Sequence, residues 1–226
     1  MHFLSFDLDG TLAESEAFDG ELYVEVVRSE MGIDIEADWT GYRHQTDSGI
    51  LNEIIDRSTP NADRSSLHFA VRRHFTDLVH DYVAARGGVI PEIPGAMHFV
   101  SRLMKHPSVR VAVATGGWKE TALIKLRAIG LDPLQLSLAS SSDAMSKVDI
   151  MRIAERRALP NENAKRKTYF GDSRYDKEAS LVLGYDFIAI GENVDHHRRY
   201  PNFLDAESIL DDLGLNGYPR VGPTIG

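Results

Sequence analysis

The chain alternates between short apolar runs and longer segments in which apolar residues recur every three or four positions. Five short runs have the length and composition of buried β-strands, at residues 2–8, 109–115, 134–139, 168–171 and 186–190. Helix-length amphipathic segments follow most of them, among them 95–106, 118–129 and 143–158. Strands that alternate with helices in this way predict a doubly wound α/β fold, in which helices cover both faces of a parallel sheet.

One long segment, residues 14–92, departs from this alternation. It contains helical patterns at 21–31, 48–57 and 65–86 with no convincing strand between them. A glycine turn at residues 9–11 precedes it, and glycine and proline are frequent at residues 87–95, where it ends. We therefore expect an inserted α-helical domain at residues 14–92 and an α/β core domain formed by residues 1–13 and 93–226. The Gly- and Pro-rich segment 217–226 is expected to be an irregular extension.

Composition excludes several classes of function. Acidic residues outnumber basic residues by 34 to 25, and the basic residues are scattered, so we expect neither nucleic acid nor a membrane surface as a partner. No apolar stretch is long enough to cross a membrane. The sequence has no cysteine, which excludes disulfides, thiolate catalysis and Cys-ligated zinc and favours a cytoplasmic location.

Candidate chemistry begins where the first predicted strand ends. Asp7 and Asp9 stand two residues apart beside Gly10, at the carboxyl end of an apolar run. In open α/β sheets, ligands bind in the crevice outside the carboxyl ends of the strands. Two carboxylates at that position are costly unless a cation compensates them. The pattern points to a bound metal, although Asp-x-Asp-Gly is also an ordinary turn sequence.

Three later segments place polar residues at equivalent positions. Thr115 and Gly116 stand between a strand and a helix, where free amides and a hydroxyl suit a phosphate group. Asp172 and Asp176 follow the fourth strand and, with Asp7, would form an all-oxygen site suited to Mg²⁺. Lys147, at the start of the helix after the third strand, would hold phosphate and screen its repulsion from Asp7. Each segment alone has a simpler explanation, as a helix cap, a surface acid or a solvated lysine.

Together the four segments resemble the four motifs of the haloacid dehalogenase (HAD) superfamily. The motifs match Asp7-x-Asp9-Gly10-Thr11, Thr115, Lys147 and Gly171-Asp172-Ser173-x-x-Asp176. The insertion after the first motif is similar to the helical cap of the phosphoglycolate phosphatase and β-phosphoglucomutase branch. The resemblance implies the strand order 3-2-1-4-5. In many relatives a proline-rich stretch follows the lysine of the third motif, but none follows Lys147. Lys165 and Lys167 are the alternative candidates for that lysine.

The resemblance implies a Mg²⁺-dependent phosphatase that acts on a small phosphorylated metabolite. Asp7 would attack phosphorus and form an aspartyl-phosphate, and Asp9 would act as general acid and then as general base. Thr115, Gly116 and Lys147 would bind the phosphate. The metal ligands would be Asp7, the Asp9 backbone carbonyl, Asp172 and Asp176, the last either as a ligand or as outer support.

The insertion is expected to act as a lid over the site. Its polar segment 41–47 lies between two helical patterns, and within it Arg43 and His44 are candidates for substrate contact. Two alternatives to a phosphatase remain open, a phosphomutase of the β-phosphoglucomutase type and a non-catalytic binding module on the same fold. A dehalogenase is disfavoured because that branch lacks the second acid, which is present here as Asp9. The sequence specifies neither the substrate nor the oligomeric state.

Overall fold

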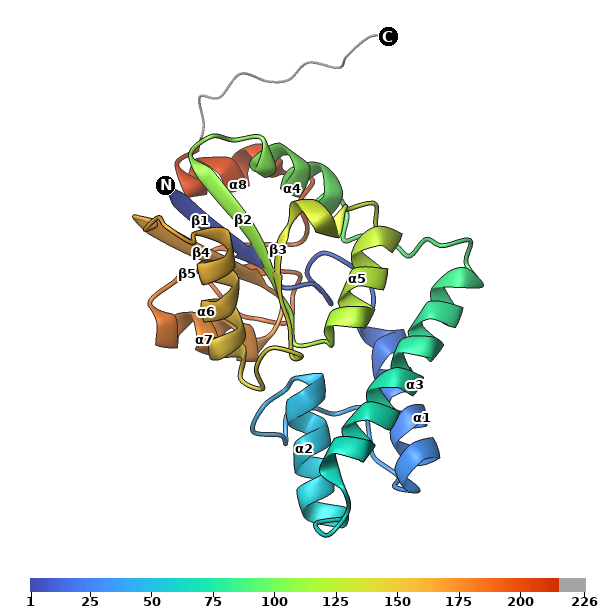
Figure 1. Ribbon diagram of the computed structural model, residues 1–226. Coiled ribbons are helices and arrows are strands. Elements are labelled where there is room, and N and C mark those ends of the chain that lie inside the picture. Colours follow the sequence, from blue (N-terminus) through green and yellow to red (C-terminus); the bar gives the residue numbers. More distant parts are fainter. Residues whose placement is uncertain (216–226) are drawn as a thin grey trace.

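The computed structural model describes residues 1–215 and shows a parallel sheet between helices, with a helical insertion at one end (Figure 1). The strands are β1 (His2–Phe6), β2 (Val109–Ala114), β3 (Ser137–Ala139), β4 (Arg166–Gly171), β5 (Asp186–Ile190) and β6 (Arg199–Tyr200). Their order in the sheet is β3-β2-β1-β4-β5-β6, and every neighbouring pair is parallel. The expected order 3-2-1-4-5 is confirmed, and β6 adds a short strand at one edge.

Helices cover both faces of this sheet. Those of the core are α4 (Ala96–Met104), α5 (Lys119–Ala128), α6 (Lys147–Ala158), α7 (Arg174–Leu183) and α8 (Ala206–Leu213). Successive strand residues point to opposite faces. Leu4 and Phe6 of β1 pack in the cluster that contains residues of α4, α5 and α8, whereas Phe3 packs in the cluster on the side of α6 and α7. The doubly wound α/β prediction is confirmed.

The third predicted strand is wrong over its first half. Residues Pro133–Gln135 form a short 3₁₀ helix, and the strand is only Ser137–Ala139. Proline occupies the first position of this turn, and the Asp132 side chain accepts a hydrogen bond from the Leu134 amide at 3.0 Å. This capping chemistry outweighs the apolar pattern, because Asp and Pro favour turns through their own local interactions.

The insertion consists of three helices, α1 (Glu16–Met31), α2 (Asp47–Ser58) and α3 (Arg64–Ala84), which lie together beyond the carboxyl end of the sheet (Figure 1). Most of their buried apolar residues form a cluster that Trp118 of the core also joins, whereas Phe18 and Val83 pack in a cluster of the core. The two connections to the core meet in a bridge between Ala13 and Glu92. The chain thus carries the predicted helical cap. Its boundaries at residues 14 and 92 stay a prediction.

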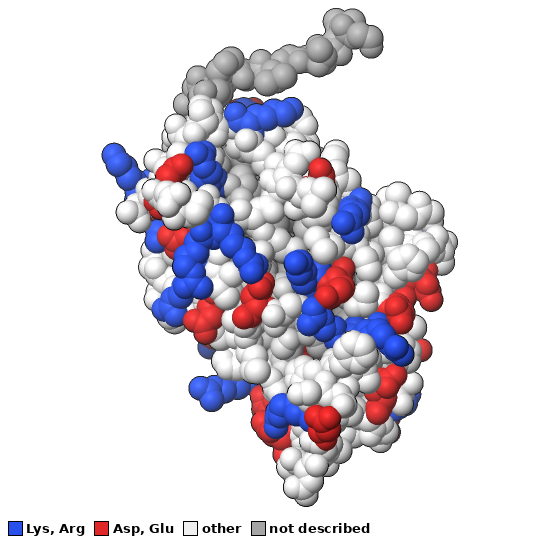
Figure 2. Space-filling view, in the orientation of Figure 1, with Lys and Arg blue, Asp and Glu red and all other residues white. Residues whose placement is uncertain are grey.

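On the face drawn in Figure 2, acidic side chains are interspersed among groups of basic ones. Among the described helices, none is both long and apolar enough to span a membrane. The extension predicted at 217–226 lies outside the described residues.

Candidate active site

The sheet brings together three carboxylates that are far apart in the sequence. Asp7 follows β1 and Asp172 follows β4, and these strands are neighbours in the sheet. Asp176 lies in the first turn of α7, where its carboxylate accepts a hydrogen bond from the capping residue Ser173 at 2.7 Å. Oxygen atoms of Asp7, Asp172 and Asp176 lie within 4.8 Å of one another, and all three residues are buried. Asp176 is thus not the surface residue of the simpler explanation.

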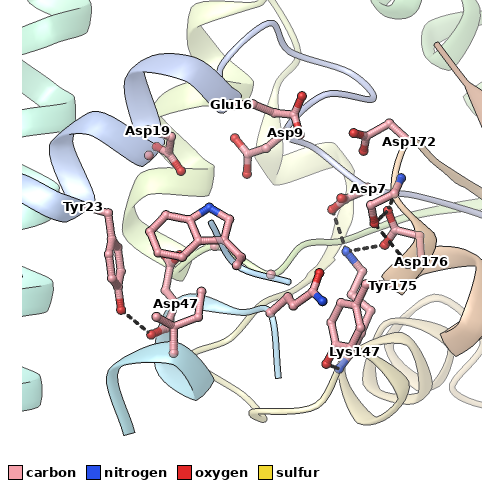
Figure 3. Close-up of a pocket in the computed structure, with 17 residues that line it drawn as sticks. Asp7, Asp9, Glu16, Asp19, Tyr23, Asp47, Lys147, Asp172, Tyr175 and Asp176 are labelled. Atoms are coloured by element: carbon pink, nitrogen blue, oxygen red, sulfur yellow. Dashed lines mark hydrogen bonds and ion pairs between the residues drawn. The ribbon is translucent and has the colours of Figure 1, made fainter. Parts of the chain in front are cut away.

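Lys147 joins two of these carboxylates. Its Nζ lies 2.8 Å from Asp7 Oδ1 and 2.9 Å from Asp176 Oδ1, as the dashed lines in Figure 3 mark. The side chain is 3% exposed and extends from the first residue of α6. Of the two alternative lysines, Lys167 pairs with Glu155 at 2.6 Å near the start of β4, and Lys165 is exposed. Lys147 is therefore the candidate that reaches the carboxylates.

The carboxylates repel one another strongly when no metal is bound. Burial, and then the charges of Asp176 and Asp7, raise the pKa of Asp172 to about 9. Burial raises the pKa of Asp7 to about 7, although Lys147 opposes the shift. One lysine does not neutralise this group. A divalent cation with a preference for oxygen ligands fits it, because such an ion would let all three side chains ionise together.

Gly10 is needed where the first motif passes over Asp172. Its φ of +74° lies in the left-handed region that favours glycine. A Cβ at this position would lie 2.7 Å from Asp172 Cγ, which is closer than real Cβ contacts. The next residue, Thr11, donates a hydrogen bond from Oγ1 to Asp172 Oδ1 at 3.1 Å. The turn therefore fixes the position of a carboxylate that follows a different strand.

Asp9 contacts a different lysine from the one that joins Asp7 and Asp176. Its Oδ1 accepts from Lys125 Nζ at 2.6 Å and from Ser15 Oγ at 2.5 Å. Lys125 is fully buried in α5 and also pairs with Asp19 Oδ1 of α1 at 2.8 Å. Burial acts to raise the pKa of Asp9, but the charge and hydrogen bonds of Lys125 and Ser15 outweigh it and hold that pKa below the usual value.

Lys125 was not identified from the sequence. The only signal in the sequence is its position in the helix, between Ala122 and Leu126, which face the core. The structure shows that its side chain is buried as well. A lysine on a buried helix face requires a partner. Nothing local in the sequence names Asp9 or Asp19 as that partner.

The second motif lies beside Asp9. Thr115 is fully buried, and its Oγ1 lies 3.5 Å from Asp9 Oδ2 and accepts a hydrogen bond from the Gly117 amide at 3.0 Å. Gly116 lines the cavity above the carboxylates, and its carbonyl accepts from the Asp47 amide at 2.9 Å. The loop after β2 therefore contacts both the first motif and the cap.

The polar cap segment 41–47 reaches the site, through Gln45 and Asp47, which line the cavity. Arg43 is exposed, and its amide donates to Glu53 at 3.0 Å. His44 is half-buried, with Nδ1 3.5 Å from the Tyr175 hydroxyl. Neither Arg43 nor His44 lines the cavity, and their contact with substrate stays a prediction.

Comparisons with known proteins agree with this geometry. The model of the haloacid dehalogenase-like hydrolase family matches residues 4–190. A hydrolase from Pseudomonas syringae shares 21% sequence identity, with a TM-score of 0.70 over 94% of this chain and 99% of that one. CbbY from Rhodobacter sphaeroides, solved with phosphate, shares 20% identity, with a TM-score of 0.68 over 90% and 95%.

A more distant structure, YfnB from Bacillus subtilis bound to magnesium, shares 17% identity, with a TM-score of 0.57 over 93% of this chain and 98% of that one. Among curated proteins, none matches the sequence. The solved structures show the fold, and the family model covers most of the chain, including all four motifs. The chain therefore belongs to the haloacid dehalogenase-like hydrolases.

Proposed function

We propose that the protein is a Mg²⁺-dependent phosphatase that hydrolyses a small phosphorylated metabolite through an aspartyl-phosphate on Asp7. The observation that carries this proposal is the contact of Lys147 with both Asp7 and Asp176, beside Asp172. A lysine between two acids binds an anion only if a further cation offsets the acids. The site is thus suited to a phosphate group held between a metal and an ammonium group.

Asp7 is the proposed nucleophile. It follows β1 directly, and its amide donates to the Phe170 carbonyl at 2.9 Å, which fixes the backbone on which the carboxylate sits. Attack of a carboxylate oxygen on phosphorus forms the aspartyl-phosphate and expels the alcohol. Attack of water then releases phosphate and restores Asp7, so that one difficult displacement becomes two easier ones.

The phosphate is proposed to bind Lys147, the Gly116 amide and the Thr115 hydroxyl. The first extends from α6, and the other two belong to the loop between β2 and α5. Lys147 and Gly116 line the cavity, and Thr115 lies buried beside Gly116. Such fixed donors stabilise charge on the transferring phosphoryl group, because they need not reorient during the reaction.

Asp9 is proposed to move protons in both steps. Its contacts with Lys125 and Ser15 favour the ionised form, which suits the general base that activates water in the second step. To protonate the leaving oxygen in the first step, Asp9 must carry a proton, and its contacts disfavour this protonated form. Esters whose leaving alcohols need little assistance are therefore expected to react faster.

Asp7, Asp172, Asp176 and the Asp9 carbonyl are the proposed residues for Mg²⁺. When bound, the ion would offset charge on the phosphoryl oxygens. The magnesium-bound YfnB structure is consistent with this choice of metal. The phosphate in the CbbY structure, and the xylulose-1,5-bisphosphate in a second structure of that protein, are consistent with a phosphorylated substrate. We also propose that residues 14–92 move as the lid.

Release of inorganic phosphate from a panel of small phosphate esters tests the proposal. We expect turnover with Mg²⁺, none after chelation, and loss of essentially all turnover in Asp7→Asn. Asp38→Asn, at an exposed position in the cap, is the control and should keep wild-type rates. Labelled phosphate bound covalently to wild-type protein and released by hydroxylamine would identify the acyl phosphate.

Retained turnover in Asp7→Asn would contradict the mechanism. An isomerised sugar phosphate in place of free phosphate would identify the phosphomutase alternative. No turnover across a broad panel would indicate the non-catalytic module.

A further inference from the structure

The cavity above the proposed phosphate site has a wall formed by the cap. We use the name cap wall for the residues of the insertion that line this cavity. They are Glu16, Asp19, Gly20, Tyr23, Trp39, Gln45, Asp47 and Ile50. Figure 3 shows Asp19, Asp47 and Tyr23 on the side of the cavity opposite Asp172 and Asp176. A substrate whose phosphate lies at Asp7 would extend its remaining atoms toward this wall. The wall is therefore the part of the chain that this remainder of the substrate would contact.

The cap wall carries no positive charge. Lys147 is the only lysine or arginine among the described residues that line the cavity, and it already contacts Asp7 and Asp176. Lys125 lies behind the wall, fully buried, and contacts both Asp9 and Asp19. Neither ammonium group is free to receive a second anionic group of a substrate.

Asp47 is a carboxylate of the wall with no direct cationic partner, and Lys125 offsets its charge only from a distance. Its Oδ2 accepts a hydrogen bond from the Trp118 amide at 2.7 Å, and no described lysine or arginine forms an ion pair with it. Burial, and then the charge of Asp19, raise its pKa well above the usual value. Because burial and the neighbouring carboxylate disfavour negative charge at this position, a cation or a hydroxyl group would be accommodated beside Asp47, whereas an anion would be destabilised.

Two aromatic rings complete the wall. Tyr23 and Trp39 pack edge to face with ring centres 5.4 Å apart, and the Tyr23 hydroxyl donates to the Asp47 carbonyl at 2.8 Å. Aromatic faces attract ammonium groups and pack against carbon-bound hydrogens, but they do not bind carboxylates or phosphates. Tyr23 is only 3% exposed and stacks on Trp118, so Trp39 offers the more accessible ring, and that ring favours the same kind of group as Asp47.

The cavity has a volume of about 160 Å³. A cavity of roughly 150 Å³ in another protein accommodates benzene. The space beyond the phosphoryl group is therefore suited to a few non-hydrogen atoms in this conformation of the cap.

From these observations, and resting on the proposed phosphatase function, we infer the class of substrate: a small phosphate monoester whose remainder carries a hydroxyl or an ammonium group and no second anionic group. Phosphorylated carboxylic acids and bisphosphates are disfavoured, because their second anion would face Asp19 and Asp47, and Lys125 behind this wall already contacts Asp9 and Asp19. Xylulose-1,5-bisphosphate, which is bound in a second structure of CbbY, carries two phosphate groups and lies outside this class.

Three two-carbon esters of similar size test this inference: phosphoethanolamine, 2-hydroxyethyl phosphate and phosphoglycolate. The second carbon carries an ammonium group in the first and a hydroxyl group in the second, and it is the carboxylate carbon of the third. We expect kcat/KM for each of the first two to exceed that for phosphoglycolate by at least about tenfold, as one unfavourable charge contact at a partly buried site predicts. Equal or faster turnover of phosphoglycolate would overturn the inference.

Binding separates this inference from the proposed function. Dissociation constants of the same esters are measured by calorimetry on Asp7→Asn with Mg²⁺, which does not require turnover. Tighter binding of the neutral and cationic esters supports the inference even if wild-type protein releases no phosphate, a result that would count against the phosphatase alone. Tighter binding of phosphoglycolate overturns the inference even if phosphate is released.

Asp47→Asn locates the selectivity. Asparagine keeps an oxygen that accepts from the Trp118 amide, so the contact between cap and core is retained. We expect the ratio of kcat/KM for phosphoethanolamine to that for phosphoglycolate to fall by at least about threefold, since one carboxylate is removed from the wall. Asp38→Asn, which changes the same charge at an exposed cap position, should leave the ratio unchanged. An unchanged ratio in Asp47→Asn would overturn the assignment of the wall.

Discussion

Lys125 Nζ lies 2.6 Å from Asp9 Oδ1, in an ion pair that links a fully buried lysine of α5 to the first motif. The same ammonium group contacts Asp19 of the cap helix α1 at 2.8 Å. The three residues connect the loop of the proposed general acid and base to the lid. Any movement of α1 away from the core would leave Lys125 with one partner.

The first prediction concerns the stability of this triad. Lys125→Met leaves two largely buried carboxylates, 19% and 15% exposed, without their cation, and we expect it to lower the free energy of unfolding by about 3 kcal/mol. Asp19→Asn should cost less. The double variant should cost less than the sum of the two, because removal of Asp19 takes away part of the penalty. Urea unfolding of the four proteins measures this coupling, and strictly additive costs would contradict it.

The second prediction concerns Gly10. We expect Gly10→Ala to lower turnover by at least about a hundredfold. The new methyl group would push the Asp172 carboxylate away from its position beside Asp7 and Asp176, where it is proposed to bind the metal. Gly32→Ala is the matched control, since Gly32 has a similar φ of +66° but nothing within 4 Å of the added methyl group. It should cost roughly 1 kcal/mol of stability and no activity. Equal losses of activity in both variants would show that backbone strain alone is responsible.

The third prediction concerns pH and metal. The pKa of Asp172 is about 9 in the folded chain, against about 3.9 in an unfolded one. The folded state therefore binds the extra proton, and the stability this provides is complete below about pH 4 and is lost as the pH rises toward 9. Asp7, with a pKa of about 7, acts in the same direction.

We accordingly expect the Tm of metal-free protein to fall between about pH 6 and pH 9. Mg²⁺ at a hundred times its Kd should stabilise the fold by about 2.7 kcal/mol, a rise of roughly 5 to 10 °C for a chain of this size. Thermal scans with Mg²⁺ and with chelator measure both effects. In Asp172→Asn both should become much smaller. A wild-type Tm that does not respond to millimolar Mg²⁺ would refute the metal site.

The fourth prediction concerns the contact between cap and core. Trp118 is 1% exposed, belongs to the apolar cluster of the cap, and donates from Nε1 to Ser48 Oγ at 2.8 Å. We expect Trp118→Ala to cost about 3 to 5 kcal/mol of stability. Trp118→Phe, which keeps most of the packing but loses the hydrogen bond, should cost nearer 1 to 2 kcal/mol. Urea unfolding that ranks the two variants equally would argue against a packing role.

Most of the fold was predictable from local pattern. The five longer strands and helices α4, α5 and α6 leave a periodic signal, because a residue must face either the core or the solvent wherever its element is placed. The two-residue strand β6 is too short to leave one. The 3₁₀ turn at Pro133–Gln135 shows where this logic fails, since the interactions of Asp132 and Pro133 with the nearby backbone outweighed the apolar pattern.

The proposed catalytic carboxylates were also predictable, since Asp7, Asp172 and Asp176 follow strands whose carboxyl ends meet at one edge of the sheet. The cap wall and the Lys125 triad were not. Lys125 and Asp9 are 116 positions apart, and Asp47 reaches the site only because the α2 end of the cap packs against the loop after β2. Local periodicity records which side of an element is buried. Which buried charges meet depends on how distant elements pack, because an ion pair forms wherever the chain brings two side chains together, at any separation in sequence.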